Sequence, residues 1–167
     1  TTATCQDGDL DSSFASNGIV ITEVAEFDHV NAIALQADGK IVAAGGTWPA
    51  SGAYDFLLAR YNADGSLDTT FGTDGITITS MSSAGDEALG VTIQPDGKIV
   101  AAGYMTTSEG YSNFALARYN VDGKLDSTFG TDGTVVTSTG DDQAVAADVV
   151  IQADGKIVIA GKSGDSS

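Results

Sequence analysis

The sequence predicts an all-β fold built from β-propeller-like repeats, and three observations carry that prediction. First, residues 61–103 and 119–161 align without a gap at an offset of 58, and 25 of their 43 positions are identical. Second, the repeat contains four short runs rich in β-branched, aromatic or alternating apolar residues. Third, no segment shows a sustained helical period, and the 21 glycines gather mostly between the runs. Four-stranded units in tandem indicate propeller blades.

A partial third copy precedes the two long ones. The Asp-Gly, Leu-Asp, Phe and Gly positions within residues 7–18 recur within residues 64–75, at an offset of 57. A β-sandwich is the alternative fold, but a sandwich does not require near-identical copies. We therefore expect about three four-stranded antiparallel blades, incomplete at the ends, in a single array whose units span about residues 5–60, 61–118 and 119–167, with the last unit lacking its fourth strand.

Each strand of the unit has its own signal. A glycine opens the first strand, and an Asp-Gly-Lys turn joins the second to the third, because glycine takes the positive φ that a tight hairpin needs. The fourth strand alternates Phe, Leu and Arg on one face with Leu or Ala and Tyr on the other. The expected strands are residues 19–24, 76–80 and 134–138 for the first; 32–36, in the first copy, for the second; 41–45, 99–103 and 157–161 for the third; and 56–61 and 114–119 for the fourth.

The charge balance excludes several classes of partner. The chain has 23 acidic and 7 basic residues, a formal net charge of −16 and a pI near 4.1. Phosphate contacts with nucleic acid are therefore excluded, and an anionic membrane surface would repel the chain. No apolar run approaches the roughly 18 residues of a membrane-spanning helix, so we expect a soluble chain without membrane insertion. One Cys and one His cannot supply a closed zinc site.

Two segments carry a family resemblance. The run FALARYNVDGKLDSTFGTDG over residues 114–133, followed by IQADGKIVIAG over residues 151–161, resembles the delta-60 repeat. This family consists of bacterial, mostly secreted or surface-attached proteins with propeller-like repeats. The resemblance covers nearly the whole chain. It implies an extracellular or cell-surface location and a structural or adhesive role, and it supplies no catalytic residues.

The repeat register predicts an open joint at the ends of the array. Residues 1–4 align with residues 58–61 of a fourth strand, whereas the last unit lacks that strand. An unpaired sheet edge is a template for another strand, so we expect self-assembly into rings or filaments by strand donation. A piece of a longer repeat array is the alternative, so the partner is either a second copy or the rest of that array. The residues assigned to assembly are Thr1, Thr2, Ala3, Thr4 and Cys5, the last as an intermolecular disulfide or as a small buried residue.

An acidic turn recurs in each unit. Oxygen ligands two residues apart on a glycine-bearing turn are typical of calcium sites, which makes calcium the cofactor to consider. The alternative is turn chemistry, in which Asp and Asn cap their own backbone. The candidate metal ligands are Asp7, Asp9, Asp11, Asp64, Asp68, Asp122 and Asp126.

Other polar and aromatic residues receive structural interpretations. Arg60 and its counterpart Arg118 are expected to pair with a turn aspartate such as Asp64 or Asp68. His29 is expected to be a loop histidine, because no nucleophile turn accompanies it. The recurring phenylalanines expected to anchor the long loop are Phe14, Phe71 and Phe129.

Exposed aromatic residues suggest one ligand site. Trp48 and Tyr54 lie in one loop, and Tyr104 and Tyr111 lie in the equivalent loop, where sugar stacking is an option. No nucleophile, metal-ligand set or phosphate loop stands out, so the sequence predicts a protein that is not an enzyme. The predicted function is an extracellular structural or adhesive repeat protein. The alternative is a calcium-dependent module that binds a glycan or surface ligand.

Overall fold

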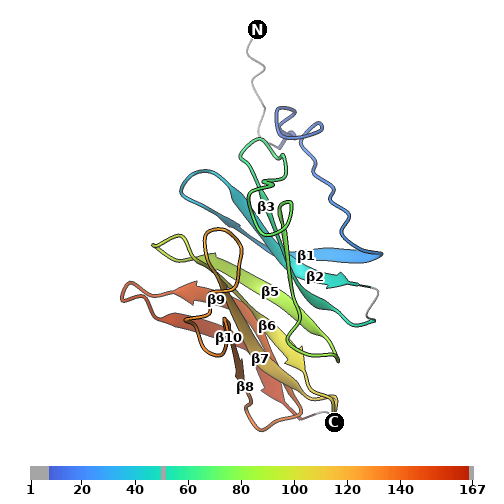
Figure 1. Cartoon of the computed structure of the whole chain (residues 1–167), viewed down its shortest axis with the longest axis vertical. Helices are drawn as coiled ribbons and strands as arrows, with labels where there is room; N and C mark the ends of the chain where they lie inside the picture. The colour runs from blue at the N-terminus through green and yellow to red at the C-terminus, as the bar shows by residue number, and fades with distance from the viewer. Residues whose placement is uncertain (1–7, 50–51, 166–167) are drawn as a thin grey trace.

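The structure, a computed structural model, describes residues 8–49 and 52–165. The described residues form ten β-strands and no helix, which confirms the all-β prediction (Figure 1). No helix long and apolar enough to cross a membrane occurs among them. The strands are β1 (Phe27–Leu35), β2 (Ile41–Trp48), β3 (Asp55–Tyr61), β4 (Ile76–Thr79), β5 (Asp86–Ile93), β6 (Ile99–Thr106), β7 (Ser112–Tyr119), β8 (Thr134–Thr137), β9 (Gln143–Ile151) and β10 (Ile157–Gly164).

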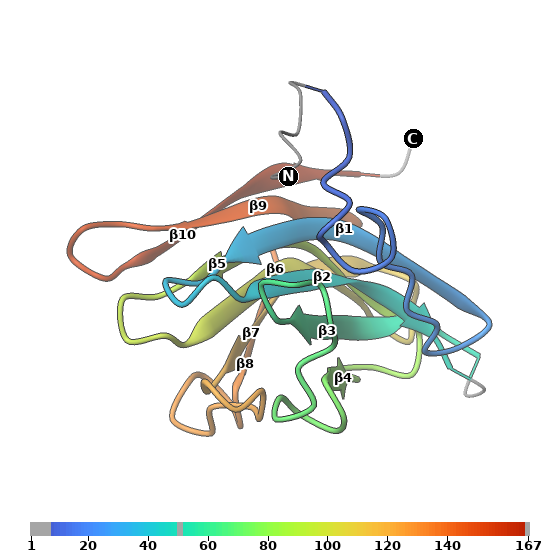
Figure 2. The ribbon, with the colours of Figure 1, turned by 90° about the horizontal axis from the view of Figure 1, so that it is seen from above.

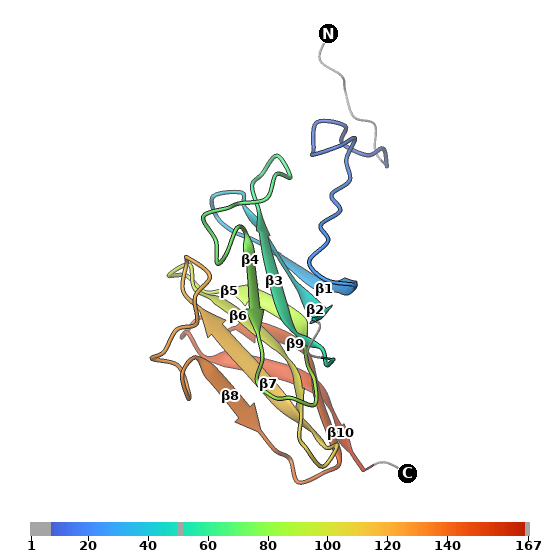
Figure 3. The same cartoon turned by 45° about the vertical axis from the view of Figure 1, so that its right-hand side comes forward.

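The strands form two complete blades and half of a third. β1 to β4 make an antiparallel sheet in chain order, and β5 to β8 repeat that order. The hairpin β9–β10 starts the third blade and joins the second sheet only by a single parallel bridge between Ser112 and Gln143. The first blade lies beside the second (Figure 3). Within the described residues the sheets are not closed into a ring.

The predicted first strand of each sequence unit is the outermost strand of the preceding blade. β4 pairs with β3, and β8 pairs with β7, so each blade runs across the boundary of two sequence units. The prediction of a strand at residues 19–24 is wrong: only Ile19 makes an isolated bridge, to Ser16. Its counterparts are strands because β3 and β7 pair with them, and the described residues provide no such neighbour for residues 19–24.

The inner hairpins are longer than predicted because their pairing continues through a bulge. β1 starts at Phe27 rather than residue 32, and it pairs with β2 as far as Trp48. The register shifts between Val30 and Ala32, and the same shift recurs in the other two hairpins. Gly45 faces this bulge, where an added Cβ would lie 1.9 Å from the carbonyl oxygen of His29. Gly103 and Gly161 occupy the same place, so the bulge requires glycine in all three copies.

Two apolar cores lie between blades. The inner strand of each blade packs on the preceding blade, β5 on β1 to β3 and β9 on β5 to β7. Small residues allow this close stacking, since an added Cβ at Gly90 in β5 would lie 3.0 Å from Asp148 Cα in β9. The outer strands β4 and β8 lie on one side of the molecule and β1 and β9 on the opposite side (Figure 2). The first core contains Val42, Ala44, Phe56, Leu58, Val91 and Tyr119 among others, and the second contains Val100, Ala102, Leu116, Ala146 and Val149.

Candidate functional site

A recurring ion-pair cluster, here called the turn cluster, fixes the long loop of each complete blade. In the first blade Asp68 Oδ2 accepts hydrogen bonds from Arg60 Nε at 2.7 Å and from Lys40 Nζ at 2.8 Å. The Arg60 guanidinium also lies 4.5 Å from the ring centre of the fully buried Phe71. The Thr70 hydroxyl donates to Asp68 Oδ1 at 2.7 Å. The carboxylate therefore joins the β1–β2 hairpin, β3 and the loop.

The second blade repeats the turn cluster. Asp126 accepts from Arg118 Nε at 2.8 Å and Lys98 Nζ at 2.9 Å, and Arg118 lies 4.4 Å from the ring centre of Phe129. The structure thus confirms the expected pairing of each arginine with a turn aspartate and the burial of Phe71. Sequence reasoning missed the lysine, although its place in every Asp-Gly-Lys turn was the available signal.

The electrostatics of the turn cluster are those of a satisfied carboxylate. Burial raises the pKa of Asp68, but hydrogen bonds from Lys40, Thr70 and Arg60 outweigh burial and hold this pKa well below its usual range. The hydrogen bond from Lys98 is the largest cause of the same lowering at Asp126. Each of the two carboxylates therefore already forms ion pairs with one lysine and one arginine side chain.

The other predicted calcium ligands are dispersed. Asp7 lies outside the described residues. Asp11 and Asp64 each accept a hydrogen bond from a serine two residues ahead, at 2.6 Å, and Asp122 pairs with Lys124 at 3.0 Å. In the described part of the chain no three His, Cys, Asp or Glu side chains come together as a metal-binding group. Asp9 is exposed at the turn before Asp11.

A polar cluster joins the first two blades where no site was predicted. His29 lies in β1, so the expectation of a loop histidine is wrong: the strand extends past the bulge to include it. Its Nε2 lies 2.7 Å from Glu87 Oε1, which also accepts from Asn31 Nδ2 at 2.8 Å. Glu87 Oε2 accepts from the Tyr104 hydroxyl at 2.9 Å. Burial raises the pKa of Glu87, but these hydrogen bonds lower it further than burial raises it.

This cluster is specific to one interface. Positions 29 and 87 are equivalent, and the third equivalent is Val145, so the pair cannot recur between the second and third blades. Gly46 leaves the space for it, since an added Cβ would lie 3.0 Å from His29 Cε1. Sequence reasoning missed the pair because equivalent residues of neighbouring blades meet only after the blades stack.

The predicted aromatic ligand residues are in contact. Trp48 and Tyr54 stack edge to face with ring centres 4.8 Å apart, and Tyr54 meets His29 at 5.2 Å. Trp48 is 39% exposed. In the equivalent region Tyr104 is engaged with Glu87, whereas Tyr111 is exposed.

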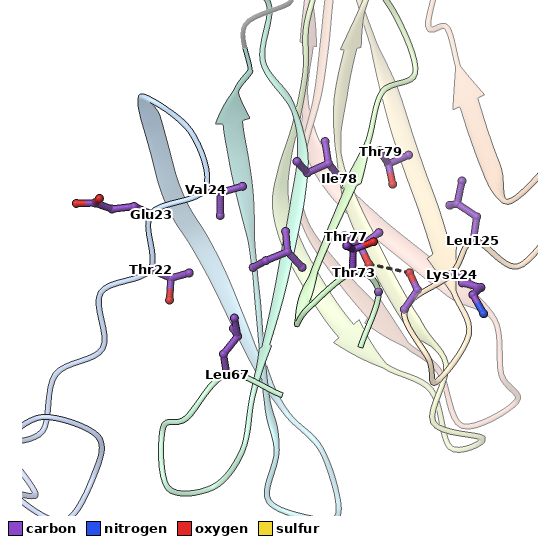
Figure 4. A pocket seen from close by; sticks show the side chains of 13 residues that line it. Thr22, Glu23, Val24, Leu67, Thr73, Thr77, Ile78, Thr79, Lys124 and Leu125 are labelled. Atoms are coloured by element: carbon purple, nitrogen blue, oxygen red, sulfur yellow. Dashed lines mark hydrogen bonds between the residues drawn. The ribbon is translucent and has the colours of Figure 1, made fainter. Parts of the chain in front are cut away.

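A groove of about 680 Å³ runs along the rim of the first blade (Figure 4). Residues 22–24 and Leu67 line it on one side of β4, and residues 123–125 line it on the other. The Thr77 hydroxyl donates to the carbonyl oxygen of Gly123 at 2.9 Å across its floor. None of the sequence-predicted site residues in the described ranges lines this groove.

Apolar side chains are exposed on the open face of the first blade. Ile33 is 70% exposed and Leu35 is 71% exposed, although both lie in the inner strand β1. The equivalents of Ile33 are Val91, 8% exposed, and Val149, 3% exposed, which lie in the two cores between blades. The exposed side chains therefore occupy positions that are buried, at Ile33, or partly buried, at Leu35, wherever a preceding blade is present.

Residues 8–24 follow the path of a preceding blade's loop and outer strand. The Tyr61 hydroxyl donates to Thr22 Oγ1 at 2.9 Å, as that of Tyr119 donates to Thr79 at the next interface. The loop backbone also repeats, since Ala15 has φ 44° where its equivalents Gly72 and Gly130 have 54°. Residues 20–22 and Val24 on one side and strands β1 to β3 on the other line a groove of about 240 Å³. This N-terminal segment passes along the open face of the first blade (Figure 3).

The comparison with known families agrees with this architecture. A family described as "domain of unknown function (DUF5122) beta-propeller" matches residues 36–71, 94–129 and 152–167, together more than half of the chain. The chain belongs to this family. Each complete DUF5122 match begins at the Gln before the Asp-Gly-Lys turn and ends at the anchoring Phe, so it contains a whole turn cluster. A search of curated proteins finds no match.

Proposed function

We propose that this DUF5122 protein is a non-enzymatic structural repeat protein of the cell exterior, whose open blade faces bind further blades. The carrying observation is the exposure of Ile33 and Leu35, whose equivalents lie in or pack against the cores between blades. Burying such side chains is favourable by roughly 25 cal/mol per Å² of apolar area. The extracellular or cell-surface location, the adhesive role and the closer delta-60 assignment belong to this proposal and rest on the sequence resemblance.

The charge of the chain supports a role in assembly rather than in indiscriminate adsorption. A net charge of −16 keeps the protein soluble and repels other anionic molecules, so that only a well-fitting apolar contact overcomes the repulsion. The ion pairs of the turn clusters join a hairpin, a strand and a loop within each complete blade. The blades are thus preformed units that stack.

The mass and shape of the native protein test the proposal. Light scattering over a range of concentrations, with negative-stain microscopy of the same samples, is expected to give masses above the 16.9 kDa of one chain and rings or filaments. A single-chain mass at every concentration would contradict assembly. Strand donation by residues 1–4 is a further part of the proposal, and these residues lie outside the described ranges.

A second candidate function is glycan binding at Trp48 and Tyr54. The supporting observation is their edge-to-face contact, with Trp48 half-exposed. Trp48 is the single tryptophan of the chain, so its fluorescence reports this site directly. Titration with chitohexaose and maltohexaose is expected to give a saturable shift of the Trp48 emission. Tyr54→Ala is expected to weaken the binding affinity at least tenfold. Tyr111→Ala is the matched control with no effect, and an unchanged spectrum at millimolar sugar would contradict the site.

A further inference from the structure

The geometry points to a second copy of this chain as the occupant of the open face, bound head to tail. The half-blade β9–β10 of one copy would pack against β1 and β2 of the next copy. It would occupy the space between those strands and residues 19–24 of the same copy. This inference rests on the proposed function and deepens it by naming the partner and the two surfaces. It differs from strand donation because it uses the faces of the sheets rather than their edges.

The surface at the far end of the array matches the surfaces that already receive a blade. Val158 in β10 is 41% exposed, whereas its equivalents Val42 and Val100 are fully buried beneath the next blade. Ala160 is exposed, whereas its equivalents Ala44 and Ala102 are buried. This face, here called the C-face, therefore has the chemistry of the two surfaces on which β5 and β9 pack.

The opposite surface, here called the N-face, presents the side chains that such a surface receives. It consists of Val30, Ile33 and Leu35 of β1, all more than half exposed. Their equivalents in β5 and β9 contact the cores between blades: Ala88, Val91 and Ile93 in one, and Ala146, Val149 and Ile151 in the other. The N-face and the C-face are thus the two halves of an interface that the molecule already forms twice.

The two ends also hold different strands of one blade. β9 and β10 are the inner two strands, and residues 19–24 lie where the outer strand of a preceding blade belongs, as the Tyr61–Thr22 hydrogen bond shows. The groove of about 240 Å³ lies between this N-terminal segment and strands β1 to β3 of the first blade. A head-to-tail joint would bring these parts together, so each copy contributes about three blades and two copies about six, within the four to eight of closed propellers.

Variants that block one face each test this arrangement. Ile33→Asp removes the N-face and Val158→Asp removes the C-face, while Val121→Asp changes a turn residue whose exposure, 51%, lies between theirs and serves as the control. Each face variant alone is expected to be a single chain by light scattering, and Val121→Asp to assemble like the native protein. An equimolar mixture of the two face variants is expected to form a two-chain complex, because one intact N-face and one intact C-face remain.

Cross-linking provides an independent measurement of the same joint. Asn31 Nδ2 donates to the carbonyl oxygen of Ala88 at 2.9 Å across the first interface, and the equivalent positions at the proposed joint are Ala147 of one copy and Val30 of the next. In a Cys5→Ser background, Ala147→Cys and Val30→Cys proteins are mixed and treated with a short bis-maleimide. A covalent heterodimer is expected, and neither protein alone should give a dimer. Circular dichroism and thermal unfolding establish that every variant is folded.

The outcomes separate the two proposals. Assembly that persists in both folded face variants would overturn the head-to-tail arrangement and leave the structural function intact. Loss of assembly in Ile33→Asp alone, without complementation, would indicate contact between two N-faces and also overturn it. A native chain that stays single at all concentrations would contradict the proposed function itself.

Discussion

Asp86 differs from its counterpart Asp28 by one hydrogen bond. The Thr47 hydroxyl donates to Asp28 Oδ1 at 2.6 Å, but Met105 stands at the equivalent position beside Asp86. Asp86 is fully buried, and its Oδ1 has no partner among the described residues. Burial, together with the neighbouring charge of Asp55, raises the pKa of Asp86. The folded state therefore holds this proton more tightly than the unfolded chain does.

The missing hydrogen bond predicts that the free energy of unfolding depends on the protonation of Asp86, and that a substitution at Met105 counters this dependence. Because the folded-state pKa of Asp86 is raised, the stability it contributes is complete below the ordinary value of 3.8 and is lost as pH rises through the raised pKa. Met105→Thr is expected to supply the missing hydroxyl and to couple favourably to Asp86 by about 1 kcal/mol at pH 7. A double-mutant cycle with Asp86→Asn, by urea unfolding, measures this coupling separately from the lost packing of Met105.

The matched control lies in the first blade. Thr47→Val leaves Asp28 Oδ1 without its hydroxyl donor and is expected to cost about 1 to 2 kcal/mol of unfolding free energy at pH 7. A coupling of zero between positions 86 and 105 would show that the added hydroxyl does not reach the carboxylate.

Each turn cluster joins a hairpin, a strand and a loop through one carboxylate, so its loss should destabilise the blade. Asp68→Asn leaves Arg60, whose side chain is 6% exposed, without its counter-charge. We expect a loss of about 2 kcal/mol at pH 7 by urea unfolding. Asp126→Asn should cost less, because the Arg118 side chain is more exposed.

The same cluster determines how the free energy of unfolding changes at acid pH. Since the folded-state pKa of Asp68 is lowered, the stability it provides is complete above the ordinary value of 3.8 and is lost progressively as pH falls from there through the lowered pKa. The difference in unfolding free energy between the native protein and Asp68→Asn is therefore expected to narrow steadily as pH falls from about 4 towards 2. A constant difference from pH 7 to pH 2 would show that the charge of Asp68 is not the cause.

The net charge of −16 acts on the entire chain and opposes its compact state. Raising NaCl from 50 to 500 mM is expected to raise the thermal unfolding midpoint, and to strengthen association of the equally acidic copies, by screening this repulsion. CaCl2 at equal ionic strength serves as the comparison. An equal shift indicates screening, whereas a larger shift that a chelator reverses would indicate calcium at the acidic turns.

Local sequence patterns determined most of the strands, the hairpin turns, the arginine pairs and the burial of Phe71. Each of these features depends on residues that are close in the chain or on a repeat that is visible in the sequence. Asp68 is eight residues from Arg60, and β2 follows β1 through one turn. Backbone pairing and turn geometry act over such short distances, so a linear pattern records them.

Only the tertiary structure decided how the blades meet. His29 contacts Glu87, Asp86 lacks the partner that Asp28 has, and residues 19–24 fail to form the strand that their counterparts form. The exposure of Ile33 against the burial of Val91 likewise depends on whether another blade lies in front. Equivalent residues of the repeat have different environments at a face covered by another blade and at an open face, because burial is a property of stacked sheets and not of a single strand.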